Sequence, residues 1–495
     1  MKKEIQLDSN GKRKFGMIDK LAYAAGDFGC NMSFSLKGTV QTFWLVYMML
    51  ETGLLSALLL VVQIWDAIND PLIGSLIDAD RRKYKMGKFK TYIFIGAVGL
   101  LVAGALVFIP APKAAVWLKA VLFIVGYVIW DACYTVANVP YGSMLSLVTE
   151  DAGERAQLST WRSVGSMVGN MLPMILLPML IWRKEVDANG DPVINPETGV
   201  QVETLLGQRV FWVAIIMGIF GFIAFMFMIK KITIRVDENS VKTNETQKFK
   251  VLDAFKNFIK NRPAVGATLA AMAMFLGMNS ASTATTIMFA TYFGMASLSG
   301  IASLVGFLPM FIFMPFIKKI VAKWGKKESS AVGALVSVGG GLLMLVFPMV
   351  SNKTAALVLY ILALSIFGIG MGIYTCVSWA LMADAIDYNE WKTGKREEGT
   401  VYSLHSFFRK LAQGIGPSIV LLIMGALGYI SEKGTGGQSA ATAYNMCWLV
   451  AGLYLFSAIL MFVSIAFIYN LDTKTMAKMN EELEASRVNT AETEA

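Results

Sequence analysis

The chain has 495 residues, of which 55% are hydrophobic and only 16% are charged. Its mean hydropathy of +0.55 is typical of a polytopic membrane protein and excludes an ordinary soluble domain. The net charge is +9, but the basic residues are scattered over the links between apolar segments. The charge therefore indicates membrane topology and argues against a nucleic-acid partner.

Twelve long apolar segments follow one another, each long enough to cross a bilayer. The first half contains Lys20–Met49, Leu54–Ile77, Thr91–Ile109, Ala115–Leu147, Leu158–Trp182 and Val210–Ile229. The second half contains Ala264–Phe293, Ser297–Ile317, Ser330–Val350, Ala355–Ala383, Val401–Ile430 and Ala441–Tyr469. We expect no cleavable signal peptide, because the N-terminus is polar and basic and the first segment is long enough to span. The pattern predicts an all-α membrane protein.

Lys and Arg concentrate in alternate links between these segments. The links 80–90 and 318–327 are rich in them, whereas the links 110–113, 351–353 and 431–438 are poorer. By the positive-inside rule, both termini are expected on the cytoplasmic side of the cell membrane. The four cysteines fall within apolar segments and predict neither a disulfide framework nor a zinc site.

The two halves repeat at one constant offset. Pro71 corresponds to Pro309, and the run Met86-Gly87-Lys88 corresponds to Trp324-Gly325-Lys326. Two parallel six-helix pseudo-repeats with 12 transmembrane helices are the arrangement of the major facilitator fold. The predicted division is 1–229 for an N-terminal bundle, 230–262 for a cytoplasmic linker, 263–470 for a C-terminal bundle and 471–495 for a cytoplasmic tail. The stretch 186–208 is expected to form a small external hairpin or loop.

Two aspartates lie one helical turn apart inside the second segment. Asp66, Asn69 and Asp70 share one helix face, and Asp66 lies about 18 Å along the helix from its start. A carboxylate at that depth is costly unless it pairs, faces water or binds an ion. The oxygens suit a small hard cation, Na⁺ or H⁺. The alternative is a helix end near water, where the aspartates are only solvated.

Other charged residues lie inside the predicted spans. Lys37 could pair with a second-segment aspartate, with Asp131 or with an anionic substrate, or it could extend toward the outer surface. Asp131 lies one turn before Thr135 and is either a third carboxylate of the cation site or a structural partner of Lys37. Asp27 is expected to make a helix-end or interdomain polar contact.

The run Trp65–Pro71, followed by Met86–Lys90, resembles the glycoside–pentoside–hexuronide:cation symporters, the family of melibiose permease within the major facilitator superfamily. The resemblance covers nearly the whole chain except the 186–208 loop and the two tails. It continues through Tyr134-Thr135, Pro140, Glu154–Leu158, Arg162, Asp384–Lys392, Tyr402-Ser403 and Lys410.

The resemblance implies roles for individual residues. The family's cation site corresponds to Asp66, Asn69, Asp70 and Thr135, and its sugar cavity to Tyr134, Arg162 and Lys410. Two sugar-binding aspartates of the family are replaced here by Asn31 and Asn138. Losing two negative charges makes an acidic sugar such as a hexuronide easier to accept. The alternative is a neutral glycoside, with Arg162 and Lys410 paired to aspartates of the second and fourth segments.

The only histidine, His405, lies next to the stripe of the eleventh segment that carries Lys410. It is either a structural hydrogen-bonding residue or a proton carrier that contributes to the substrate site.

Charged residues at the cytoplasmic ends of both halves are expected to form a gating network that breaks when the inside opens. Its candidate members are Arg81, Arg82, Arg155, Asp384, Asp387, Tyr388, Glu390 and Trp391. The alternative is a solvated loop without a coupling role, because surface ion pairs contribute little alone.

The expected function is symport of a sugar or glycoside with Na⁺ or H⁺ by alternating access, in a chain that functions as a monomer. We expect no catalytic assembly, no cofactor beyond the co-transported cation and no ATP drive, because no nucleotide-binding motif is present. If sodium is the cation, Asp66 and Asp70 hold it. The alternatives are a lysolipid or amphiphile carrier of the same fold and a sensor that binds a glycoside without moving it.

Overall fold

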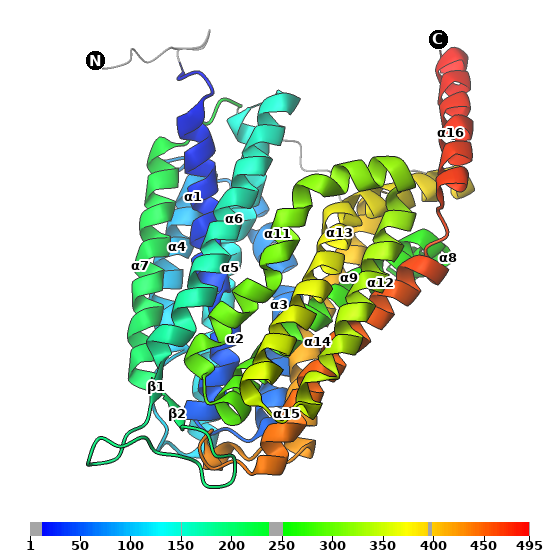
Figure 1. The fold of residues 1–495 in the computed structure, drawn as a ribbon. Helices are drawn as coiled ribbons and strands as arrows, with labels where there is room; N and C mark the ends of the chain where they lie inside the picture. The colour runs from blue at the N-terminus through cyan, green and yellow to red at the C-terminus, as the bar shows by residue number, and fades with distance from the viewer. Residues whose placement is uncertain (1–11, 150, 237–250, 395–397, 495) are drawn as a thin grey trace, which may run out of the picture. The chain divides into compact units, whose positions relative to one another are not determined.

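The computed structural model describes residues 12–149, 151–236, 251–394 and 398–494, so part of the expected 230–262 linker lies outside the described residues. The chain separates into two compact units (Figure 1). Unit 1 comprises Met1–Val193, Gln201–Glu245 and Ile430–Gly437, and unit 2 comprises Ile194–Val200, Thr246–Tyr429 and Gln438–Ala495. Each unit thus includes one short segment from the other half of the sequence.

Unit 1 is a bundle of long helices with one small sheet. Its elements are α1 (Met17–Phe34), α2 (Leu36–Thr42), η1 (Phe43–Tyr47), α3 (Thr52–Ala79), α4 (Lys88–Leu106), α5 (Val116–Val148), α6 (Ala152–Ile181), β1 (Trp182–Lys184), β2 (Glu203–Leu205), α7 (Gly207–Lys231) and η6 (Ser431–Lys433). Helix α1 packs against α6 and α7, α4 packs against α5 and α7, and α3 packs against α5. The sheet pairs β1 and β2 antiparallel, with Trp182 opposite Leu205, so the 186–208 stretch leaves and rejoins the bundle as a hairpin.

Unit 2 is a second helical bundle. Its elements are α8 (Val251–Lys260), α9 (Arg262–Phe275), η2 (Leu276–Ser280), α10 (Ala281–Met288), η3 (Phe289–Phe293), η4 (Ala296–Leu298), α11 (Ser299–Trp324), α12 (Lys326–Met344), η5 (Phe347–Met349), α13 (Lys353–Thr393), α14 (Glu398–Ala426), α15 (Ala440–Val463), η7 (Ser464–Ile468) and α16 (Thr473–Glu494). Helix α13 packs against α9, α11 and α12, and α15 packs against α9, α10 and α12.

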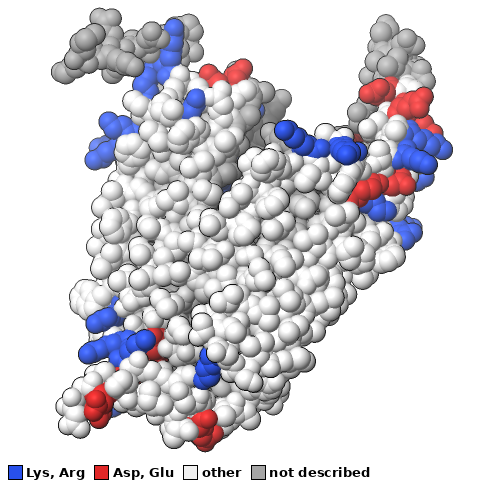
Figure 2. Space-filling view, viewed as in Figure 1, with Lys and Arg blue, Asp and Glu red and all other residues white. Residues whose placement is uncertain are grey.

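Eleven helices among the described residues are long and apolar enough to cross a membrane. The first predicted segment, Lys20–Met49, is not among them. It is divided into α1, α2 and η1, and it carries Asp27, Asn31 and Lys37, which lower its hydropathy. Charged side chains in Figure 2 gather toward two opposite ends of the visible face and over α16, and the broad band between them is white. This distribution fits helices whose middle parts lie in hydrocarbon.

The repeat expected from the sequence is visible in equivalent helices of the two units. Helices α4 and α12 both have 19 residues and begin at the equivalent residues Lys88 and Lys326. Each is preceded by a glycine with positive φ, Gly87 at 86° and Gly325 at 93°. A residue with a Cβ is strained in that conformation, which explains why both positions are occupied by glycine.

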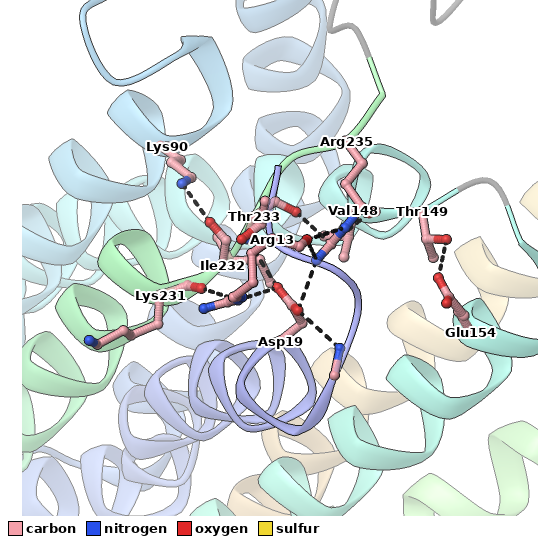
Figure 3. A network of polar contacts seen from close by, with 11 residues as sticks. Arg13, Asp19, Lys90, Val148, Thr149, Glu154, Lys231, Ile232, Thr233 and Arg235 are labelled. Carbon is pink, nitrogen blue, oxygen red and sulfur yellow. Dashed lines mark hydrogen bonds and ion pairs between the residues drawn. The ribbon is translucent and has the colours of Figure 1, made fainter. Parts of the chain in front are cut away.

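At one end of unit 1 the buried carboxylate of Asp19 links several segments of the chain (Figure 3). Asp19 is fully buried and accepts from Arg13 at 2.6 Å and from Arg235 at 3.0 Å. Arg235 also donates to the carbonyl oxygen of Val148 at 3.1 Å, near the end of α5. The network therefore ties the segment after α7 to the start of α1 and the end of α5.

Candidate functional site

A chain of hydrogen bonds links α3 to α5 inside unit 1. Asn69 is fully buried, and its Nδ2 donates to Asp131 Oδ2 at 3.2 Å and to Thr135 Oγ1 at 2.8 Å. The Thr135 hydroxyl donates in turn to Asp70 Oδ1 at 2.8 Å. Four of the residues expected at the cation site are thus connected, and Asp131 is one of them. We call Asp66, Asn69, Asp70, Asp131 and Thr135 the carboxylate cluster.

Lys37 lies beside the fifth member of the cluster. Its Nζ is 4.0 Å from Asp66 Oδ2 and 5.1 Å from the centre of the Phe34 ring. It also interacts electrostatically with Asp131. The structure therefore places its ammonium beside Asp66 of α3, one of the partners expected for Lys37.

Two oxygens of the cluster have no hydrogen-bond partner among the described residues, namely Asn69 Oδ1 and Asp131 Oδ1, and both are buried. A buried acceptor without a partner is costly, and a bound cation or a proton would satisfy it. In the part of the chain that the structure describes, no group of three or more His, Cys, Asp or Glu side chains is placed to hold a metal ion. The neutral oxygens of Asn69 and Thr135 would have to complete the shell of a cation here.

A second polar network joins α1 to α6. Arg162 Nε donates to Asp27 Oδ1 at 3.0 Å. Asn31 Nδ2 donates to Asp27 Oδ2 at 3.2 Å and to Ser166 Oγ at 3.1 Å, and Asn170 Nδ2 donates to Asn31 Oδ1 at 2.7 Å. Two expected sugar-site residues, Asn31 and Arg162, are thus brought together by Asp27.

Sequence reasoning missed three members of this network, Asp27, Ser166 and Asn170. Asp27 was expected at a helix-end or interdomain contact, but it holds Arg162 within unit 1. The signal that could have found them is spacing: Asp27 and Asn31 are four residues apart on α1, and Arg162, Ser166 and Asn170 follow at the same interval on α6.

Small residues allow α1 and α6 to come this close. A Cβ added to Gly165 would lie 2.1 Å from the carbonyl oxygen of Ala24, and a Cβ added to Gly169 would lie 2.9 Å from Cβ of Asn31. Neither distance occurs between real atoms in contact. The backbone of α6 therefore lies directly against α1 because positions 165 and 169 have no side chain.

Helix α5 carries residues of the carboxylate cluster and residues that contact α1. The Tyr134 ring is 6.0 Å from the Phe34 ring of α1. Asn138 Oδ1 accepts from Cys30 Sγ at 3.7 Å, again on α1. Since Asp131 and Thr135 belong to the carboxylate cluster, one helix connects that cluster with α1.

The expected residues of the second half lie on α14 in unit 2. His405 is buried, and its Nδ1 is 2.8 Å from Thr268 Oγ1 of α9. Its ring also meets the Trp379 ring edge-on at 6.1 Å. This contact between α9 and α14 is what a structural histidine makes. Lys410 lies on the same helix, one turn after Ser406.

Several members of the expected gating network have partners within their own unit. Asp384 accepts from Lys326 Nζ at 2.7 and 2.9 Å, and Trp391 Nε1 donates to Glu482 of α16 at 2.6 Å. In unit 1, Arg155 Nε donates to the carbonyl oxygen of Thr149 at 2.9 Å.

The link between α3 and α4 is organised around Asp80. It accepts from the hydroxyls of Tyr84 at 2.5 Å and Tyr92 at 2.6 Å, and from the backbone N–H of Arg82 at 2.9 Å. Because these hydrogen bonds favour the carboxylate, the pKa of Asp80 is lowered to about 2.

The chain matches the family described as MFS/sugar transport protein over residues 22–473. It is 30% identical over 481 residues to the uncharacterized symporter YnaJ of Bacillus subtilis (strain 168), covering 96% of each chain. It is 28% identical over 419 residues to the glucuronide carrier protein homolog of Escherichia coli (strain K12), covering 83% of this chain and 84% of the relative. A solved D-xylose–proton symporter aligns with a TM-score of 0.59 and 15% identity over 92% of this chain and 98% of that one, a likeness in fold alone.

Proposed function

Because the chain belongs to the MFS/sugar transport protein family, we propose that it carries a sugar or glycoside across a membrane together with a cation. It is a multi-pass membrane transporter and not an enzyme. The expected major facilitator fold is confirmed by the family match and by the solved structures. The observation that supports cation coupling is the carboxylate cluster, in which buried oxygens of Asn69 and Asp131 have no partner among the described residues.

The cation acts by joining α3 to α5. In our proposal it binds among the oxygens of the carboxylate cluster, offsets carboxylate charge and fixes α5 against α3. Helix α5 also carries Tyr134 and Asn138 toward α1, so a cation that orders α5 raises the affinity of the sugar site. By linkage, the sugar raises the affinity for the cation equally. The loaded carrier then changes between outward- and inward-facing states. One charge moving through 100 mV supplies about 2.3 kcal/mol, or about a fiftyfold sugar gradient.

We propose Na⁺ as the cation. Asn69 and Thr135 add neutral oxygens that a proton does not need. Asp131 would add surplus negative charge and favour H⁺, but the ammonium of Lys37 lies on the same side of the cluster and offsets it. Uptake that does not depend on Na⁺ but is lost when a protonophore is added would show that H⁺, and not Na⁺, is the coupled cation.

The substrate is held, in this proposal, by the network of Asp27, Asn31, Arg162 and Asn170. The expectation of an acidic sugar came from the loss of two family aspartates near Arg162 and Lys410, and in the structure Asp27 pairs with Arg162. A substrate carboxylate is therefore not needed to balance this charge, and we propose a glycoside recognised through its hydroxyl groups. A matched glucoside is expected to compete with labelled uptake at least as well as its glucuronide, and the reverse order would restore the acidic-sugar proposal.

The experiment is transport by the full-length protein in proteoliposomes. Counterflow of a labelled glycoside, tested over a panel of sugars, separates a carrier from a sensor that only binds. Concentrative uptake driven by a Na⁺ gradient is expected for the wild type and lost in Asp70→Asn, whereas counterflow is reduced less. Full concentrative uptake by both Asp66→Asn and Asp70→Asn overturns the cation site. Transport of a lysolipid but of no sugar would favour the amphiphile carrier.

We also propose the cell membrane as location, with both termini cytoplasmic and the chain acting as a monomer. The basic links 80–90 and 318–327 support this orientation. Labelling of single cysteines placed in those links, in intact cells against inverted vesicles, tests it.

A further inference from the structure

Lys37 lies on α2, the short helix that follows the end of α1 at Phe34. Its ammonium is 4.0 Å from Asp66 Oδ2, and the two side chains are 27% and 20% exposed. The groups that face it come from three helices: the Phe34 ring of α1, Asp66 of α3, and Tyr127 and Asp131 of α5. Lys37 therefore brings a positive charge to one side of the carboxylate cluster.

The contact between Lys37 and Asp66 is loose. A nitrogen–oxygen distance of 4.0 Å is beyond hydrogen-bond range, whereas Arg162 and Asp27 are 3.0 Å apart. A lysine ammonium is also a compact charge on a flexible four-carbon stem. The hold of Lys37 on Asp66 is therefore weaker than the hold of Arg162 on Asp27.

The ammonium and a sodium ion carry the same charge and bind the same kind of oxygen. Resting on the cation coupling proposed above, we propose that Lys37 competes with the transported cation for the carboxylates of Asp66 and Asp131 and thereby sets the cation affinity of the cluster. Lys37 is a specificity-determining residue in this account. It holds the affinity low enough for the cation to leave again on the other side of the membrane.

The size of the effect follows from Coulomb's law. At an effective dielectric constant of about 20, a unit charge within roughly 12 Å of the bound cation changes the binding constant by about tenfold or more. Removing the ammonium in Lys37→Met should therefore lower the Na⁺ concentration for half-saturation by about tenfold. Lys37→Arg keeps the charge and should bind Na⁺ within about twofold of the wild type.

The test is equilibrium binding of radioactive Na⁺ to the purified full-length protein in detergent, which needs no sugar. Lys37→Gln repeats Lys37→Met with a polar side chain, in case the first variant fails to fold. Lys230→Met on α7 is the matched control, because Lys230 is an exposed lysine far along the chain from the cluster. Adding Asp131→Asn to Lys37→Met should return the half-saturation point toward the wild-type value, since one carboxylate charge is removed with the ammonium.

The outcomes separate this inference from the proposed function. If the wild type binds Na⁺ and Lys37→Met binds it no more tightly, the competition is wrong although cation coupling stands. If neither protein binds Na⁺, both are wrong for sodium. Na⁺ binding that appears only in Lys37→Met or Lys37→Gln supports the competition and overturns Na⁺ as the transported cation of the wild type. A lysine that only contacts the substrate would leave Na⁺ binding unchanged and alter the sugar affinity alone, which also overturns the inference.

Discussion

Asp27 and Arg162 form an ion pair, with 3.0 Å between Oδ1 and Nε, one helical turn before Asn31 on α1. The family resemblance implied a carboxylate at position 31, where this chain has an amide. Asn31 donates to that same Asp27 carboxylate at 3.2 Å. The carboxylate of this chain thus lies one helical turn before the position at which the family has one, and it is hydrogen-bonded to the amide that stands there.

We predict that Asp27→Asn and Arg162→Gln are strongly coupled. The Asp27 side chain is only 9% exposed, so each single variant leaves a partly buried charge unpaired and should cost about 2 kcal/mol of stability. Because Arg162 is 38% exposed, water offsets part of that cost. The double variant should lose less than the sum of the two, which thermal unfolding of the four proteins in one detergent measures. Additive losses would mean that the pair contributes nothing as a pair.

We predict that Asp80 contributes to stability over the whole physiological pH range. Its pKa is lowered to about 2 by hydrogen bonds from Tyr84, Tyr92 and the N–H of Arg82, against an ordinary value of 3.8. A lowered carboxyl pKa stabilises the folded state above the unfolded pKa, and this contribution is lost as the pH falls through the folded pKa. The difference in melting temperature between wild type and Asp80→Asn should be constant from about pH 8 to 5 and shrink between about pH 4 and 2.

The Asp80 prediction has a graded control. Tyr84→Phe removes one of the hydroxyl donors and should move the low-pH midpoint upward by less than the full shift. A difference that changes between about pH 5 and 8 would point to another titrating group.

The fold could be predicted from the sequence to the level of its helices. The apolar segments indicated a membrane protein with many spans. The repeated glycines, Gly87 and Gly325, precede equivalent helices in the two units. The first segment was predicted as one long span, but the structure divides it into α1, α2 and η1. Hydropathy averages over a window, so it does not show where the backbone changes its hydrogen-bond pattern.

The candidate site was predicted in part for a similar reason. The spacing of Asp66, Asn69 and Asp70 places them on one face of α3, and periodicity shows this directly. The partner of Arg162 is 135 residues away at Asp27, and a single sequence does not show which faces of α1 and α6 meet. The close packing of Gly165 against Ala24 determines which faces meet, and this packing is seen only in the tertiary structure.

We predict that Gly165→Ala disrupts the contact between α1 and α6. The added Cβ would lie 2.1 Å from the Ala24 carbonyl oxygen, a backbone atom that cannot rotate away, so the helices must separate. The cost should be about 3 kcal/mol or more, with loss of sugar binding because Asp27 and Arg162 move apart. Gly142→Ala on α5 is the matched control, since a Cβ there meets nothing within 4 Å. It should be neutral or stabilising by up to about 1 kcal/mol. Equal melting temperatures for the two variants would contradict the prediction.

The last prediction concerns Thr135, whose hydroxyl lies between Asn69 and Asp70 in the hydrogen-bond chain of the carboxylate cluster. Its Oγ1 accepts from Asn69 at 2.8 Å and donates to Asp70 at 2.8 Å. Thr135→Val keeps the shape of the side chain but removes both hydrogen bonds and one cation ligand. It leaves Asp70 without this donor, and the loss of this one charge-assisted bond should cost about 1.5–3 kcal/mol.

Transport separates a coupling role for Thr135 from a purely structural one. Thr135→Val should raise the Na⁺ concentration for half-maximal uptake by about tenfold or more, because about 1.4 kcal/mol corresponds to a factor of ten. Counterflow at saturating sugar, which needs no cation gradient, should fall less. Thr135→Ser restores the hydroxyl and should recover most of the cation affinity. If Thr135→Val and Thr135→Ser behave alike, the hydroxyl takes no part in cation binding, and the proposed link between α3 and α5 loses its central residue.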